Sequence, residues 1–261
     1  MPEAGQPIIE LRDISLAYDH YQVLQGINFT IRQGEIFIIM GGTGSGKSTI
    51  LKSMIGLLPP TKGQVLYDGV SFWEIEPFQQ DQIMRRFGIL YQSGALWSSM
   101  TLAQNIALPL EQNTDLDKKE IRDIVALKLS LVGLEGFANF YPSEISGGMR
   151  KRAGLARALA LDPDILFFDE HSTGLDPISA HNLDELILQL RDSLGTTVVV
   201  VTHDLESIFA IGTDSILLDA ESKTIIASGN PKNLLNESQD QRVAAFLSRS
   251  KKILKPGVYN D

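Results

Sequence analysis

The stretch MGGTGSGKST, from Met40 to Thr49, decides the fold of this chain. It follows the apolar run IFII and contains four glycines and one lysine. Glycines have no Cβ, so the backbone N–H groups of such a loop can close around the oxygens of a phosphate chain. The lysine adds a positive charge beside them. The stretch therefore predicts a loop that binds the phosphates of a nucleotide.

The spacing within this loop fits the pattern G-x-x-x-x-G-K-[ST], with Gly41, Gly46, Lys47 and Ser48 at the fixed positions. In that pattern the lysine reaches the β and γ phosphates and the hydroxyl binds Mg²⁺. We therefore expect a nucleotide with β and γ phosphates, together with Mg²⁺, as ligands. The expected nucleotide-binding residues of the loop are Gly41, Gly42, Thr43, Gly44, Ser45, Gly46, Lys47, Ser48 and Thr49.

The segments on either side of the loop supply a strand and a helix. Residues 35–40, EIFIIM, are typical of a buried strand, and residues 47–58, KSTILKSMIGLL, have apolar positions at helical spacing. A helix that begins at the loop points the positive end of its dipole at the phosphates. This context favours a phosphate loop over a plain glycine-rich turn.

Composition limits the class of protein. The chain has 261 residues, of which 43% are hydrophobic, and this suits one large α/β domain or a domain with a subdomain. Its net charge of −9 does not favour a nonspecific nucleic-acid surface, and the absence of cysteine excludes disulfides and thiolate metal sites. No apolar run approaches the roughly 18 residues that span a bilayer. We expect a soluble, cytoplasmic protein that reaches a membrane only through a partner.

The pattern along the chain changes twice. Strand-like alternation surrounds the loop, at residues 7–18 and 63–72 for example, and gives way to helical spacing from Pro77 to about Leu134. After Pro163 strands and helices alternate, and runs such as TVVVVT suit a sheet that is covered on both faces. The sequence predicts an open α/β core that is interrupted by a helical insertion.

A second group of polar residues follows the apolar strands after the insertion. ILFFDE ends in Asp169 and Glu170, at the edge where an α/β sheet presents its ligands. Asp169 can hold Mg²⁺ opposite Ser48, and Glu170 can polarise the water that attacks the γ phosphate. The alternative is an acidic pair that merely ends a strand.

Two histidines lie near the same edge. His203 ends the strand VVVVT, where it is either a γ-phosphate contact or a structural residue with a satisfied hydrogen bond. His171 directly follows the candidate base Glu170, and we expect a turn residue there.

The segment SEISGGMRKR supplies a third element. Ser146 can cap a helix whose first N–H groups, near Gly147 and Gly148, form a second anion site. A site in the helical insertion cannot fold back onto the phosphate loop of its own chain. It would serve better across a dimer interface.

Taken in order, these segments resemble the ATP-binding cassette ATPases over nearly the whole chain, from about Ile8 to about Asn236. GGTGSGKST matches the Walker A loop, ILFFDE the Walker B strand, ISGGM the signature, STGLD the D-loop and VTHD the switch histidine. The resemblance implies a P-loop NTPase fold of the α/β class, with a mixed sheet core, an antiparallel β subdomain and a helical signature subdomain. It implies an ATPase domain over residues 1–236, with the helical subdomain inserted at about 77–160. Residues 237–261 would form a C-terminal extension at the dimer interface.

The resemblance also assigns roles to single residues. It implies a head-to-tail homodimer in which Ser146, Gly147 and Gly148 of one copy contact the ATP held by the other. Asp176 in the D-loop would contact nucleotide too, and Tyr18 would stack on adenine unless it is a buried strand aromatic. The implied catalytic residues are Glu170, His203, Gln92 and Lys47, and the implied Mg²⁺ ligands are Ser48, Gln92 and Asp169.

Within this family, the segments QSGALW and SGGMRKR are most similar to the ATPase subunits of the Mce-type lipid transporters, which maintain lipid asymmetry in a Gram-negative outer membrane. The implied cargo is phospholipid. The implied partners are an inner-membrane permease, a periplasmic Mce-domain protein and a STAS-domain protein, with the ATPase on the cytoplasmic face of the inner membrane.

Several alternatives remain open from the sequence. Met149 replaces the usual signature glutamine, and His171 replaces the proline that usually follows the catalytic glutamate. A cassette ATPase for another cargo, a cassette protein acting on DNA or ribosomes, and a regulator without turnover are the other functions considered. The cluster at Ala95, Leu96 and Trp97 is either a docking surface for the permease or part of the subdomain core.

Overall fold

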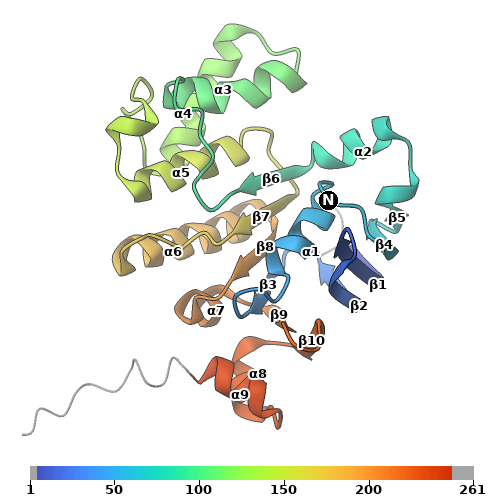
Figure 1. Cartoon of the computed structure of the whole chain (residues 1–261). Helices are drawn as coiled ribbons and strands as arrows, with labels where there is room; N and C mark the ends of the chain where they lie inside the picture. The colour runs from blue at the N-terminus through green and yellow to red at the C-terminus, as the bar shows by residue number, and fades with distance from the viewer. Residues whose placement is uncertain (1–4, 249–261) are drawn as a thin grey trace, which may run out of the picture.

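The computed structural model describes residues 5–248 of the chain, which form two sheets surrounded by helices (Figure 1). The larger sheet has the strand order β10-β9-β3-β8-β7-β6. Its strands are β3 (Ile36–Gly41), β6 (Phe87–Leu90), β7 (Ile165–Asp169), β8 (Thr197–Thr202), β9 (Asp214–Asp219) and β10 (Thr224–Ser228). All neighbours in it are parallel except β9 and β10.

The smaller sheet is antiparallel and has the order β2-β1-β4-β5. Its strands are β1 (Pro7–Tyr18), β2 (Tyr21–Arg32), β4 (Lys62–Tyr67) and β5 (Val70–Ser71). The expected mixed sheet core and antiparallel β subdomain are thereby confirmed.

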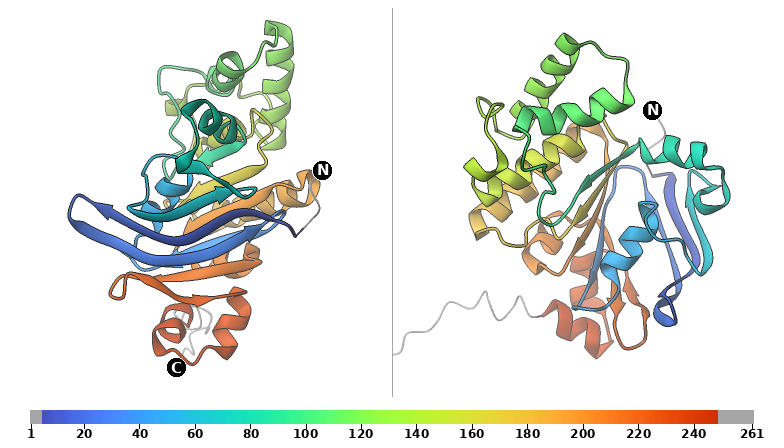
Figure 2. Two further views of the ribbon diagram at one scale, coloured as in Figure 1. Left: turned by 90° about the vertical axis from the view of Figure 1, so that its right-hand side faces the viewer. Right: turned by 45° about the horizontal axis from the view of Figure 1, so that its top comes forward.

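The helices fall into groups in space. α3 (Leu102–Asn113), α4 (Lys118–Leu131) and α5 (Gly147–Ala158) form a helical subdomain at one end, and α8 (Pro231–Glu237) and α9 (Gln241–Leu247) lie at the opposite end (Figures 1 and 2). The remaining α-helices are α1 (Lys47–Met54), α2 (Pro77–Met84), α6 (Pro177–Leu194) and α7 (Leu205–Ile211), and Phe72–Glu74 and Pro142–Glu144 form short 3-10 helices. None of the helices within residues 5–248 is both long enough and apolar enough to cross a membrane.

Strand β3 separates two hydrophobic cores, because successive side chains of a strand point to opposite faces. Ile36, Ile38 and Met40 pack with the helical subdomain and with α6 and α7. Phe37 and Ile39 pack on the other face, with α1 and the antiparallel sheet. Full burial on both faces explains why this strand is a continuous apolar run in the sequence. The phosphate loop and the start of α5 therefore belong to different layers of the molecule.

The parallel register brings the ends of several strands to one edge. Met40 pairs with Thr202, Asp169 with Val201, and Leu90 with Phe168. The residues that follow β3, β8, β7 and β6 in the chain all leave the sheet at this edge. The fold thus places the loops that carry the predicted site beside one another.

One part of the expected helical region is wrong. The structure has helix α2 where helical spacing begins at Pro77, but residues 87–90 form strand β6 beside β7 instead of continuing the helix. A short apolar run such as FGIL fits either structure, so periodicity cannot separate them. Gly88 explains the outcome in part, since a Cβ there would lie 2.4 Å from the carbonyl oxygen of Ala158. The close approach of α5 favours glycine at this point of the sheet.

The expected C-terminal extension, residues 237–261, contributes side chains to the hydrophobic core. Val243 and Leu247 of α9 are fully buried and pack in the same cluster as Ile208 and Ile211 of α7. The segment 241–247 is therefore integral to the fold of the chain. The remainder of the extension, residues 249–261, lies outside the described residues.

Candidate functional site

The phosphate loop is built on glycine geometry. A Cβ on Gly41 would lie 2.4 Å from Ser45 Oγ and 2.7 Å from the carbonyl oxygen of Leu218, and Gly44 and Gly46 have φ angles of 77° and 93° that other residues rarely adopt. The Ser45 hydroxyl is buried and has no hydrogen-bond partner among the described residues. An orphaned donor and a narrow backbone cradle fit a ligand with oxygen acceptors, as phosphates are.

Lys47 folds back over this loop. Its ammonium group donates hydrogen bonds to the carbonyl oxygens of Gly41, at 3.0 Å, and Gly42, at 3.1 Å, and lies 3.9 Å from Glu170 Oε1. Burial lowers the pKa of Lys47, and the Glu170 and Asp169 carboxylates act against that shift. The predicted phosphate-binding lysine is therefore in place at the N-terminus of α1.

Ser48 and Asp169 face each other across the loop. The Ser48 hydroxyl donates to Asp169 Oδ1 at 3.4 Å. Burial raises the pKa of Asp169, and the neighbouring Glu170 carboxylate adds to the rise. A cation would relieve this crowding of negative charge, and one carboxylate plus one hydroxyl suits Mg²⁺, which keeps several positions for water and phosphate oxygens. The residues present thus fit the expected ion.

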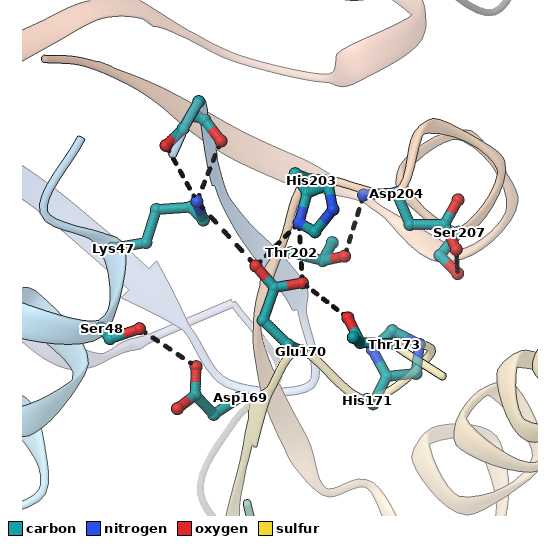
Figure 3. A network of polar contacts seen from close by, with 12 residues as sticks. Lys47, Ser48, Asp169, Glu170, His171, Thr173, Thr202, His203, Asp204 and Ser207 are labelled. Atoms are coloured by element: carbon teal, nitrogen blue, oxygen red, sulfur yellow. Dashed lines mark hydrogen bonds and ion pairs between the residues drawn. The ribbon is translucent and has the colours of Figure 1, made fainter. Parts of the chain in front are cut away.

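Glu170 is the centre of a polar network (Figure 3). His203 Nδ1 lies 2.9 Å from its carboxylate, and the Thr173 hydroxyl donates to Oε2 at 3.2 Å. The backbone of Glu170 has a φ of 54°, a left-handed conformation that non-glycine residues seldom adopt. Glu170 and His203 are therefore brought together as predicted, and the carboxylate is held in a fixed orientation.

Lys151 was not predicted from the sequence, yet it holds the loop that carries Glu170. Its ammonium group donates to the carbonyl oxygens of Glu170, His171 and Thr173, at 3.1, 2.5 and 2.8 Å. The sequence could have indicated that Lys151 is buried, because it lies three and four residues before Gly154 and Leu155, on the same buried face of α5.

His171 differs from the expected plain turn residue. It lies in a turn, since Thr173 N–H donates to the Glu170 carbonyl oxygen, but its ring is fully buried. Nε2 of the ring lies 2.8 Å from Asp184 Oδ1, and Asp184 Oδ2 accepts a hydrogen bond from Ser207 at 2.8 Å. This buried polar chain connects the loop after β7 with α6 and α7. Sequence reasoning missed Asp184 and Ser207.

Gln92 and Tyr18 lie apart from this network. Gln92 is exposed, two residues beyond the end of β6, at the same edge of the sheet as Asp169. Tyr18 ends β1 with 42% of its surface exposed, and Lys52 Nζ lies 3.4 Å from its hydroxyl. The alternative of a buried strand aromatic is therefore wrong, and the role of Tyr18 in binding adenine stays a prediction.

The predicted second anion site is located at the start of α5. Ser146 caps this helix and accepts a hydrogen bond from the Met149 N–H at 3.2 Å, as expected. Gly148 lies beside α6, since a Cβ on it would be 3.4 Å from Ser179 Oγ. Asp176 caps α6 through the Ser179 N–H at 3.0 Å, and the hydrogen bonds from Ser179 lower its pKa. The structure does not bring these residues to the phosphate loop of their own chain.

Trp97 lies on the surface, so its alternative place in the subdomain core is wrong. Its exposed fraction is 58%. It borders a cavity of about 280 Å³, and Asn105 fixes the loop by accepting from the Trp97 N–H at 2.7 Å and donating to its carbonyl oxygen at 3.1 Å. Lining residues include Phe87, Tyr91, Pro109, Arg157 and Leu161.

Comparisons with known proteins agree on one family. A family model described as ABC transporter matches residues 24–173. The intermembrane phospholipid transport system ATP-binding protein MlaF of Haemophilus influenzae is 41% identical over 93% of this chain and 91% of its own length. The probable ribonucleotide transport ATP-binding protein mkl of Mycobacterium tuberculosis is 40% identical over 92% of this chain and 66% of its own length.

Solved structures share the fold. A dimeric post-hydrolysis state of the ATP-binding cassette MJ0796, bound to ADP and Pi, superposes with a TM-score of 0.77 at 30% identity. The match covers 85% of this chain and 97% of that chain. The likeness therefore extends to nearly the whole of a solved cassette.

Proposed function

The chain belongs to the ABC transporter family of ATP-hydrolysing transport subunits, and on this premise we propose that it powers the transport of phospholipid between membranes. The similarity to MlaF proteins, relatives that belong to intermembrane phospholipid transport systems, supports this cargo. The observation that carries the proposed chemistry is the contact between Glu170 and His203 beside the phosphate loop.

Each residue of the site has a distinct role in this proposal. Lys47 and the backbone of the loop bind the phosphates of ATP, with Ser48 and Asp169 in position to hold Mg²⁺, which adds positive charge to the phosphate oxygens. Glu170 accepts a proton from the attacking water, and His203 keeps the carboxylate oriented toward it. Gln92, which follows the neighbouring strand β6, would contact the water and the ion when they are bound.

A second copy of the chain completes the site. Ser146 and the N–H groups near Gly147 and Gly148 belong to the layer of helices on the far face of β3 from α1, so they cannot contact the chain's own phosphate loop. A head-to-tail homodimer would place them, together with Asp176, against the ATP of the partner. The dimeric form of the cassette MJ0796 supports this arrangement.

The exposed surface around Trp97 is the proposed docking site for the membrane permease. An exposed tryptophan beside a cavity suits a protruding segment of a partner. In this assembly the ATPase lies on the cytoplasmic face of the inner membrane. A periplasmic Mce-domain protein and a STAS-domain protein would complete the complex.

A different cargo is the second candidate function. The relative from Mycobacterium tuberculosis is nearly as similar and its name refers to ribonucleotide transport. The ATPase site itself contains nothing that would select a cargo, because the cargo passes through the permease.

Purification from membranes in mild detergent, followed by mass spectrometry, tests the cargo and the partners. We expect a permease, an Mce-domain protein and phospholipid to purify with the chain, and we expect Trp97→Ala to lose the permease. Leu127→Ala is a matched control, because Leu127 is a comparably exposed apolar residue on α4. A different permease without lipid would refute the phospholipid proposal and favour the second candidate.

A further inference from the structure

The ammonium group of Lys151 is an unusual feature of α5. It is buried, with 5% of the residue exposed, and it donates hydrogen bonds to the backbone carbonyls of Glu170, His171 and Thr173. Within residues 5–248 no carboxylate lies close enough to form an ion pair with it. A cation whose hydrogen-bond acceptors are all neutral is costly to bury, and desolvation lowers the pKa of Lys151 to about 8, although the Glu170 carboxylate acts against that shift.

Lys128 shows how the same chain buries a lysine for packing. It lies on α4, is equally buried, and forms an ion pair with Asp162 at 2.5 Å. That pair keeps its charge compensated at contact distance, whereas Lys151 forms no ion pair within residues 5–248 and the Glu170 carboxylate offsets its desolvation only in part. The comparison favours a task for Lys151 beyond stability.

The place of Lys151 in α5 suggests that task. It lies about one helical turn from Gly147 and Gly148, at the end of the helix that faces the partner's nucleotide in the proposed dimer. At its other end the side chain grips the loop in which Glu170 adopts a left-handed conformation. One buried side chain therefore connects the signature end of α5 with the loop that carries the Glu170 carboxylate of the same chain.

A second contact of α5 acts on the neighbouring loop. Arg157 donates to the carbonyl oxygens of Ala95, at 2.7 Å, and Gly94, at 3.3 Å, in the loop that also carries Gln92. Movement of α5 would therefore act on both loops at the edge of the sheet.

We propose that Lys151 is a positioning residue. When the start of α5 contacts the nucleotide held by the second copy, Lys151 transmits this contact to the loop of its own copy and so sets the position of Glu170. The inference rests on the proposed dimeric ATPase. ATP pulls the start of α5 toward the partner, Lys151 carries the shift to the carbonyls of the loop, and Glu170 reaches its working position.

Steady-state ATP hydrolysis and ATP binding to the full chain test the first half of this proposal. Lys151→Gln should lower kcat about 10- to 100-fold, the scale expected when a catalytic group is misplaced by about an ångström, with ATP affinity unchanged. Lys151→Arg keeps the positive charge but places it on a planar guanidinium group, so its kcat should lie between those of Lys151→Gln and wild type. Lys128→Gln is the matched control and should keep wild-type kcat even where it lowers the melting temperature.

Hydrogen exchange tests the coupling itself, in a Glu170→Gln background that holds ATP. ATP should slow exchange in residues 147–150 and in residues 170–176, and Lys151→Gln should abolish only the second effect. If Lys151→Gln fails to fold, Lys151→Arg takes its place in both experiments, with a smaller loss expected in each.

The experiments distinguish a failure of the proposal for Lys151 from a failure of the proposed ATPase function. Wild-type kcat in Lys151→Gln, or full protection of residues 170–176 in that variant, would overturn this inference alone. A wild-type chain that does not hydrolyse ATP, together with a Glu170→Gln chain in which ATP protects neither segment, would instead overturn the proposed function.

Discussion

At the scale of the residue, the site depends on side chains buried behind it. Glu170 contacts His203, but the turn that holds it rests on Lys151 and on the chain His171–Asp184–Ser207. Buried polar groups are expensive when they lose a partner, so these residues make the geometry of the loop sensitive to substitution.

Asp184→Ala should destabilise the chain by about 1–3 kcal/mol, because it removes the partner of the buried His171 ring and leaves the Ser207 hydroxyl only the long contact of 3.5 Å to Asp204. Denaturant unfolding measures this loss. Glu185→Ala, at an exposed neighbouring position of α6, is the control and should change stability by no more than about 0.5 kcal/mol. Equal effects of the two substitutions would show that the buried hydrogen bonds of Asp184 contribute nothing to the stability of the protein.

The stability contributed by Lys151 should depend on pH. Its pKa is lowered to about 8 in the folded chain, below its usual value of 10.5, so the folded state binds fewer protons between these two values. Stability therefore rises from pH 8 toward pH 10.5 and is lost as the pH falls through 8. Between pH 8 and pH 10.5 the unfolding free energy of wild type should rise relative to that of Lys151→Met. A difference that stays constant would mean that Lys151 keeps its ordinary pKa.

The sequence showed the reacting groups better than their supports. Asp169, Glu170 and His203 lie where apolar strands end, and Lys47 and Ser48 begin a helix after a glycine-rich loop. Both signals are local in the sequence. Lys151 and Asp184 contact the catalytic loop from helices elsewhere in the chain, so only the folded structure reveals their partners.

At the scale of the element, α5 is the helix that fixes the loops of the site. Gly154 allows its close approach to the loop after β6, because a Cβ there would lie 2.9 Å from the Gly94 carbonyl oxygen and 2.9 Å from Leu90 Cδ1. Gly88 allows the same helix to approach β6 itself, where a Cβ would lie 2.4 Å from the Ala158 carbonyl oxygen.

Gly154→Ala should therefore destabilise the chain, by about 1–3 kcal/mol, although alanine favours helix. The added methyl group has to displace backbone atoms as well as a flexible side chain. Thermal or denaturant unfolding measures the effect. A variant as stable as wild type would show that α5 does not pack as tightly against this loop as the structure indicates.

Element type was predictable where the pattern was long. The apolar run of β3, the cap at Ser146 and the alternation after Pro163 all led to the observed elements. Strand β6 was missed because a run as short as FGIL, directly after a helix, fits both periods, and its partner β7 comes much later in the chain.

At the scale of the whole molecule, the two predicted anion sites of one chain lie in different layers. The phosphate loop packs with α1 and the antiparallel sheet, while Ser146 belongs to the layer of helices on the other face of β3. The position of Ser146 in the helical insertion predicted that it would lie apart from the phosphate loop of its own chain, and the two segments do lie in different layers. Assembly of two copies remains the proposal that gives the start of α5 a ligand.

ATP hydrolysis by the purified chain, with and without Glu170→Gln, tests the central claim most directly. Glu206→Gln is the control, because Glu206 is an exposed acid at the start of α7, near His203 in sequence but outside the network. We predict that wild type and Glu206→Gln release phosphate, whereas Glu170→Gln releases none and is trapped by ATP as a dimer in size-exclusion chromatography. Unchanged phosphate release by Glu170→Gln would contradict the assignment of Glu170 as the catalytic base and the account built on it.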